Sequence, residues 1–112
     1  PERAAELAAL GVELVRGDLV EPASLAAALA GCERVLACAH GLLGRGRWRS
    51  EAVDDAGHRA LIDAARVARV DRFVYVSAAG AAPGHPVDFF RTKHAIEAAL
   101  AGSGLAHVVL RP

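Results

Sequence analysis

The side chains best suited to chemistry lie near the carboxyl end of the chain. Ser77 closes a β-branched apolar run, and Lys93 follows on the next helical segment. A hydroxyl and an ammonium placed together can hold a carbonyl oxygen and supply it with a proton. A phenol beside the ammonium would be a better proton donor, and the position four residues before the lysine would place one there. That position is Phe89, which has no proton to give.

Small and polar residues also follow the earlier apolar runs. Asp18 follows the first run, and Ala39, His40 and Gly41 follow the second. In open α/β sheets ligands bind beyond the carboxyl ends of the strands, so these residues and Ser77 are expected at one edge. The residues alone leave two alternatives open, a turn role for Asp18 and a local hydrogen bond for His40.

Helical and strand patterns alternate along the sequence, and these elements must position the candidate residues. Between the strands lie helical segments: the first ends at Gly11, the second starts at Pro22 and stops at Gly31, and the fourth starts after Asp88 and stops at Gly102. The third has Ser50 as its expected N-cap and carries one apolar face, made of Val53, Ala56, Gly57, Ala60, Leu61, Ala64, Ala65 and Ala68. Short, nearly continuous apolar runs predict strands at 12–16, 34–39, 73–77 and 107–110.

Strands that alternate with helices imply βαβ units with right-handed crossovers. The expected fold class is therefore α/β, a doubly wound, Rossmann-like parallel sheet with helices on both faces, in a single domain over residues 1–112. The sequence opens inside a helix and closes directly after a strand, which predicts that the sheet is incomplete and the domain truncated at both ends. The glycine- and arginine-rich stretch 41–50 is expected to form a mobile loop.

Composition excludes several classes of function. The 13 basic and 13 acidic residues balance without long runs of either sign, so neither a nucleic acid nor a membrane is expected as a partner. No apolar stretch is long enough to span a membrane and the start resembles no signal peptide, which together predict a cytoplasmic protein. Cys32 and Cys38 are expected to be buried free thiols, and no metal site is predicted.

Three long segments carry a family resemblance that covers nearly the whole chain. They are GVELVRGDLVEPASLAAALAGCERVLACA, VDDAGHRALIDAARVARVDRFVYVSAAGA and FFRTKHAIEAALAGSGLAHVVLRP. The chain resembles the short-chain dehydrogenase/reductase superfamily, in particular its atypical, NmrA-like NAD(P)-binding branch. The Gly-Asp-Leu motif, the Val-Asp-x-x-Gly helix start, the Val-x-Val-Ser strand end, the lysine and the final Leu-Arg-Pro occur in the order and spacing of that branch.

The resemblance implies a nicotinamide dinucleotide at the strand ends, with NADP favoured over NAD. By this resemblance Asp18 would accept a hydrogen bond from the adenine amino group, and the Leu19 backbone would contact the edge of the adenine ring. Ser77 would hold a substrate oxygen or contact the nicotinamide region, and Lys93 would reach the nicotinamide ribose. The turn against the adenosine ribose would consist of Ala37, Ala39 and His40.

The implied function is that of an oxidoreductase, which transfers hydride between the cofactor and a small-molecule substrate and in which Ser77 and Lys93 are the catalytic residues. Two departures from the family matter. The Gly-rich loop that would bind the pyrophosphate belongs to a first βα unit that this sequence lacks, and Phe89 replaces the usual tyrosine.

Two other functions stay open. One is a non-catalytic NAD(P)H sensor that acts through a protein partner. The weaker one is a nucleotide-sugar epimerase or dehydratase, because those relatives retain the tyrosine. The resemblance is also compatible with a homodimer.

Overall fold

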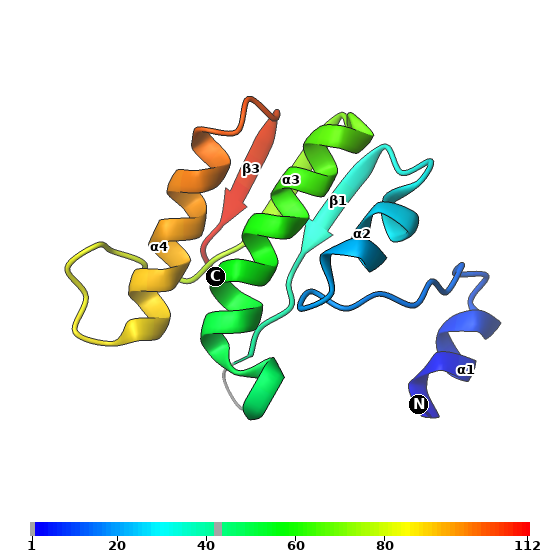
Figure 1. Cartoon of the computed structure of the whole chain (residues 1–112), viewed down its shortest axis with the longest axis horizontal. Helices are drawn as coiled ribbons and strands as arrows, with labels where there is room; N and C mark the ends of the chain where they lie inside the picture. The colour runs from blue at the N-terminus through cyan, green and yellow to red at the C-terminus, as the bar shows by residue number, and fades with distance from the viewer. Residues whose placement is uncertain (1, 42–43) are drawn as a thin grey trace.

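A parallel sheet forms the centre of the computed structural model, which describes residues 2–41 and 44–112. Its strands are β1 (Arg34–Ala37), β2 (Arg72–Val76) and β3 (His107–Leu110), in the order β1-β2-β3 (Figure 1). Ala37 pairs with Tyr75 across the first pair of strands, and Tyr75 pairs with Val109 across the second. The sheet confirms the α/β class and the incomplete Rossmann-like architecture expected from the alternating periods.

The helices begin and end close to where the sequence punctuation predicts them, with α1 and α2 before β1 and the others between the strands. Pro22 opens α2, where its fixed φ suits the first helical position. None of the helices in the described part of the chain is long and apolar enough to cross a membrane. The helical elements are α1 (Glu2–Ala9), α2 (Pro22–Leu29), the 3₁₀ helix η1 (Gly46–Trp48), the π-helix η2 (Glu51–Gly57), α3 (His58–Ala68) and α4 (Asp88–Ala101).

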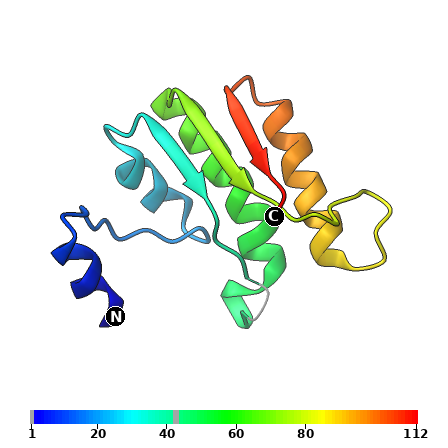
Figure 2. The ribbon, with the colours of Figure 1, turned by 180° about the vertical axis from the view of Figure 1, so that it is seen from behind.

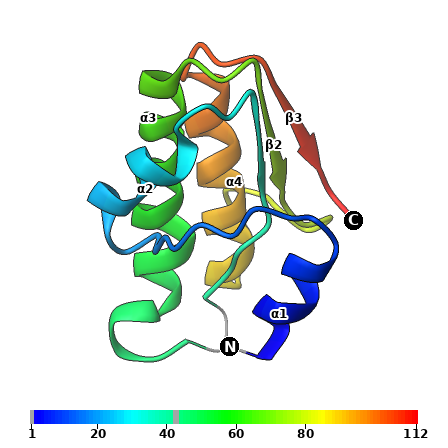
Figure 3. The same ribbon diagram turned by 90° about the vertical axis from the view of Figure 1, so that its right-hand side faces the viewer.

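The helices α2, α3 and α4 cover one face of the sheet (Figure 3). Seen from behind, the strands lie foremost, with no described helix over them (Figure 2). The strand order explains this one-sided arrangement, because successive crossovers of one hand that step in the same direction place their helices on the same face. Helices on the second face are expected only after the order of strands reverses, and the described strands contain no reversal.

The core lies between the sheet and these helices. Phe73 and Tyr75 project from β2 onto Ile96 and Leu100 of α4, and all four side chains are fully buried. The opposite face of the sheet is less protected, since Leu36 of β1 is 64% exposed. The alternation of buried and exposed residues along β1 therefore follows from cover on one face alone.

The strand predicted at 12–16 is wrong. This segment has no regular secondary structure and pairs with no strand of the described chain, and Val12, Leu14 and Val15 are each about half exposed. The apolar pattern reports what the residues could bury, whereas a strand also needs a neighbour to accept its hydrogen bonds. Without that neighbour the pattern alone does not produce a strand.

The predicted third helix begins differently from the expectation. Ser50 occupies the predicted N-cap position, but its backbone angles are helical and its side chain makes no capping hydrogen bond. The first turns form the π-helix η2, whose wider turn shifts the buried face along the sequence. As a result Asp54 and His58 are buried, whereas Ala56 and Ala68 of the predicted apolar face are exposed.

The two cysteines are free, as predicted, but both are exposed, so the expectation of buried thiols is wrong. Cys38 lies just beyond β1, where the chain leaves the sheet, and Cys32 lies in the turn after α2. In the predicted loop 41–50, positions 42 and 43 lie outside the described residues, and η1 occupies part of the remainder.

Candidate functional site

The ends of β1 and β2 bring most of the predicted site residues to one edge of the sheet. Ala37 ends β1, and Ala39 and His40 follow it as exposed residues. Ser77 directly follows β2, and Lys93 reaches the same point from α4 by donating a hydrogen bond to the Val76 carbonyl at 3.0 Å. The structure therefore brings together residues from β1, β2 and α4, as the parallel arrangement predicts.

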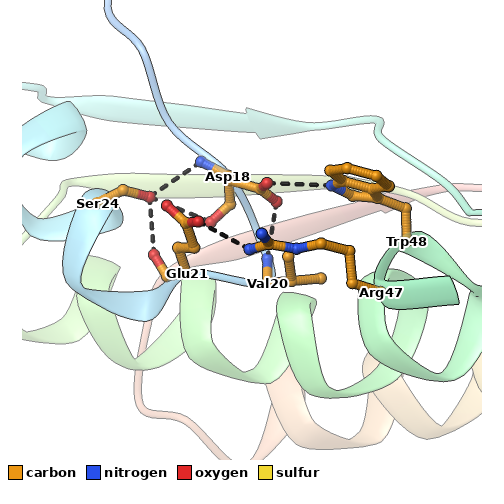
Figure 4. A network of polar contacts seen from close by, with 6 residues as sticks. All are labelled: Asp18, Val20, Glu21, Ser24, Arg47 and Trp48. Atoms are coloured by element: carbon orange, nitrogen blue, oxygen red, sulfur yellow. Dashed lines mark hydrogen bonds and ion pairs between the residues drawn. The ribbon is translucent and has the colours of Figure 1, made fainter.

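Asp18 is held in its loop by several hydrogen bonds (Figure 4). Its Oδ1 accepts the Val20 backbone N–H at 3.0 Å, which closes an Asx turn. The Trp48 indole N–H donates to Oδ2 at 3.1 Å. Ser24 Oγ accepts the Asp18 backbone N–H at 2.9 Å. The turn role for Asp18 is thus present, and each carboxylate oxygen accepts a hydrogen bond from another described residue.

The charge of Asp18 is stabilised in this loop. The hydrogen bonds from the Val20 backbone and the Trp48 indole hold the pKa of the carboxyl below its usual range. Asp18 therefore carries a full negative charge at neutral pH. Among the described residues no hydrogen bond engages the neighbouring Leu19 N–H. An acceptor and a donor thus lie side by side on adjacent residues.

Gly57 of η2 positions this loop against the helix. A Cβ at Gly57 would lie 2.8 Å from the Leu19 Cβ and 2.9 Å from the Ala52 carbonyl oxygen. The loop can approach this closely because residue 57 has no side chain. The π-helix therefore fixes the position of the Asp18 loop as well as that of its own buried residues.

Asp54 attaches the turn after β1 to the same π-helix. Its side chain is 1% exposed. One carboxylate oxygen accepts the Gly41 backbone N–H at 2.8 Å, and the other accepts the Ser50 hydroxyl at 2.5 Å. Because Gly41 immediately follows Ala39 and His40, this buried carboxylate determines where the predicted ribose-binding turn lies.

Lys93 is enclosed by aromatic rings. It is 5% exposed, and its Nζ lies 4.9 Å from the ring centre of Tyr75 and 5.4 Å from that of Phe89. Burial lowers the pKa of the ammonium, although the charge of Asp54 opposes this effect. Phe89 and Lys93 share one face of α4, as the four-residue spacing predicts. The lysine is therefore a buried ammonium that releases its proton more readily than a solvated one.

Ser77 is engaged on the helix side of the sheet. Its hydroxyl donates to Glu97 Oε2 of α4 at 2.6 Å, and the Arg111 guanidinium donates through Nε to the other carboxylate oxygen at 3.2 Å. Burial raises the pKa of Glu97, but the hydrogen bonds from Arg111 and Ser77 outweigh it and hold the pKa below its usual range. An ionised Glu97 keeps the Ser77 proton directed at itself, and the free lone pairs of Ser77 can only accept.

His58 and Tyr75 form the buried floor beneath Lys93. Their rings meet edge to face with centres 5.4 Å apart, and His58 Nδ1 lies 2.8 Å from the Val53 carbonyl oxygen. His58 Nε2 and the Tyr75 hydroxyl have no hydrogen-bond partner among the described residues. Burial raises the pKa of Tyr75, so its phenol stays neutral.

Burial of His58 predicts that the protein loses stability as the pH falls from 7 to 5. Burial lowers the pKa of the imidazole, although the Val53 carbonyl opposes this effect. Below about pH 6.5 the unfolded chain binds a proton that the folded chain does not. The free energy of unfolding therefore falls by at most about 1.4 kcal/mol for each pH unit. Urea unfolding at several pH values gives the slope of the free energy of unfolding against pH. This slope should be shallower for His58→Gln than for the wild type. The exposed His107→Gln is the control, and equal slopes for His58→Gln and the wild type would refute the assignment.

Several residues of this edge were not singled out by the sequence. Asp54 and His58 fit the role of ordinary residues in a first helical turn, and only the π-helix turns them inward. Glu97 resembles a surface glutamate in the sequence. Its signal is the four-residue spacing from Lys93, which places both on one face of α4.

Comparison with known proteins places these features in a family. The NAD(P)H azoreductase of Xenophilus azovorans is 34% identical over 110 residues, which cover 98% of this chain and 35% of that protein. The triphenylmethane reductase of Citrobacter superposes with a TM-score of 0.79 at 27% identity, over 98% of this chain and 36% of that one. The NADPH-dependent quinone oxidoreductase of Escherichia coli gives a TM-score of 0.73 at 28% identity, over 100% of this chain and 34% of that one.

This chain spans about a third of the length of these relatives. A family model described as NAD(P)H-binding matches residues 1–112, the whole of the sequence. The fold, the order of motifs and this match agree, and the chain belongs to the NAD(P)H-binding family, among the atypical, NmrA-like short-chain dehydrogenases/reductases.

Proposed function

We propose that residues 1–112 form most of the dinucleotide-binding part of an NAD(P)H-dependent oxidoreductase. It transfers hydride between the nicotinamide cofactor and a small organic substrate, and NADPH is the preferred cofactor. Relatives named as reductases of azo compounds, quinones and triphenylmethane dyes support both the reaction and a conjugated substrate. A cytoplasmic location and a homodimer are part of the proposal.

The paired acceptor and donor at Asp18 and Leu19 carry this proposal. The edge of an adenine presents an amino group, which donates, next to a ring nitrogen, which accepts. Asp18 Oδ2 and the Leu19 N–H offer the complementary pair on adjacent residues. The charge of Asp18 strengthens the bond to the amino group. The loop therefore fits the adenine end of the cofactor, and the proposal assigns the ribose to the turn of Ala37, Ala39 and His40.

At the other end of the site, Lys93 supplies the proton that reduction of a carbonyl requires. One of its N–H groups is bonded to Val76, so two remain for a ribose hydroxyl and a substrate oxygen. Burial lowers its pKa and makes that proton easier to give. Phe89 excludes water beside it. When bound, the nicotinamide supplies the hydride.

Ser77 has a different role from that of a donor to a carbonyl. Because its proton is directed at Glu97, Ser77 offers lone pairs to a ligand. The proposed partner is therefore a donor, such as the carboxamide N–H of the nicotinamide. Catalysis then depends on Lys93, and Ser77 binds the cofactor.

Phe89 supports one alternative, in which the protein binds NAD(P)H as a regulatory signal for a protein partner. Tight binding of NADPH without reduction of any quinone, aldehyde or azo compound would favour that alternative.

We expect Asp18→Asn to weaken NADPH binding by roughly tenfold in the full-length protein. The amide oxygen can still accept the Val20 N–H and keep the turn, while the amide N–H₂ faces the adenine amino group as a second donor. Calorimetric titration measures the change. Asp71→Asn, at the amino end of β2, is the matched control and should bind as the wild type does. Equal affinities for all three proteins would return Asp18 to a turn role alone.

A further inference from the structure

We propose that Trp48 competes with the adenine for Asp18, so that the indole must leave its hydrogen bond before the dinucleotide is bound. The inference rests on the proposed function, because it concerns the adenine end of the same site. It assigns to Trp48 control over the affinity for the adenosine half of the cofactor.

The chemistry of the donors is the first argument. The indole N–H is a donor only, and it occupies Asp18 Oδ2 at 3.1 Å. The other carboxylate oxygen already accepts the Val20 N–H within the turn. An adenine amino group is also a donor, and the oxygen that it needs is the one that Trp48 holds. The side chain therefore takes the place of the nucleobase in the hydrogen bonding of Asp18.

The weak hold on Trp48 is the second argument. Its side chain is 51% exposed, so little burial keeps it in place. The Arg47 guanidinium lies 5.2 Å from the centre of the indole ring, and Arg47 itself pairs with Glu21 at 2.7 Å. Both members of that ion pair are about half exposed, and pairs of this kind contribute little to stability. Displacement of the indole therefore costs little free energy.

The space around this network is the third argument. A cavity of about 360 Å³ opens beside the indole and the carboxylate. Its walls come from the Asp18 loop, from α2 and from η1, so an occupant of the cavity contacts all three. The residues that line it are Arg16, Gly17, Asp18, Glu21, Ser24, Arg47 and Trp48.

Trp48→Phe in the full-length protein tests the competition. Phenylalanine keeps an aromatic ring but has no N–H, so Asp18 Oδ2 becomes free. We expect NADPH and 2′,5′-ADP to bind about three- to tenfold more tightly than to the wild type, the range for loss of one partly exposed, charge-assisted hydrogen bond. Nicotinamide mononucleotide, which has no adenine, should bind equally to both. Arg49→Ala, in the same loop and paired at the surface with Glu51, should leave all three affinities unchanged.

Indole fluorescence gives a second measurement. The difference between the spectra of the wild type and Trp48→Phe isolates this residue, and it should shift when 2′,5′-ADP is added but not with nicotinamide mononucleotide. Equal or weaker NADPH binding by Trp48→Phe would overturn the competition, and weaker binding would mean that the indole helps to hold the adenine. Failure of the wild type to bind NADPH at all would overturn the proposed function and the competition together.

Discussion

Replacing Phe89 by tyrosine should raise the rate of carbonyl reduction by about a hundredfold or more, the usual gain from a positioned general acid. The ring centre of Phe89 lies 5.4 Å from Lys93 Nζ, on the same face of α4. A phenol there would lie beside a buried ammonium, which lowers the pKa of the phenol and makes it a better proton donor. The gain should appear with quinones and aldehydes as substrates and with NADPH as the reductant.

The neighbouring phenylalanine provides the matched control. Phe90 packs against His85, with ring centres 4.3 Å apart, and against Gly80. Phe90→Tyr therefore adds the same hydroxyl one position away, without a place beside Lys93. We expect it to reduce carbonyls at the rate of the wild type. If Phe89→Tyr also left the rate unchanged, or if Lys93→Met reduced carbonyls as fast as the wild type, the acid would lie elsewhere.

Asp54→Ala should lower the free energy of unfolding by about 2 to 4 kcal/mol. The substitution leaves the buried Gly41 N–H and the Ser50 hydroxyl without their acceptor, and each unsatisfied group costs about 1 to 3 kcal/mol. Asp55→Ala is the matched control, because its half-exposed carboxylate pairs with Arg59 at the surface. That variant should change stability by no more than about 0.5 kcal/mol. Urea unfolding of the three proteins decides between them.

Asp54→Asn separates the hydrogen bonds from the charge. The amide oxygen can accept the Gly41 N–H, and its N–H₂ can donate to the Ser50 hydroxyl once that hydroxyl rotates. We therefore expect most of the stability to return. A loss as large as that of Asp54→Ala would show that the negative charge itself, facing Lys93, stabilises the fold.

The sequence predicts those helices and strands that are marked by residues within or beside the element itself. Pro22 and Gly102 mark a helix start and a helix end correctly, and the apolar runs locate β1, β2 and β3 to within a few residues. The same signal fails at 12–16, because strand formation depends on a partner elsewhere in the chain. Local pattern therefore identifies candidates, and pairing decides which of them become strands.

The candidate site is predictable to a smaller extent. The convergence of Ser77 and Lys93 follows from parallel strands and could be foreseen. The direction of the Ser77 hydroxyl could not, because it depends on Glu97 and Arg111, which arrive from other elements. Asp54 and Asp55 are equivalent in sequence, and in the π-helix the first is buried while the side chain of the second is half exposed. Contacts between elements determine the direction of the Ser77 hydroxyl, and a departure from ideal helix geometry determines the burial of Asp54.

The sequential order β1-β2-β3 also bears on how the chain folds during synthesis. Each strand pairs with the next one along the chain, Arg34 with Arg72 and Phe73 with His107, so every pairing closes a loop of similar length. The entropy of closure depends only weakly on loop length, and neither pairing has an advantage on that ground. The ribosome supplies the advantage, since β1 and β2 emerge before β3 is made. We expect the sheet to grow strand by strand, with α3 docking before α4.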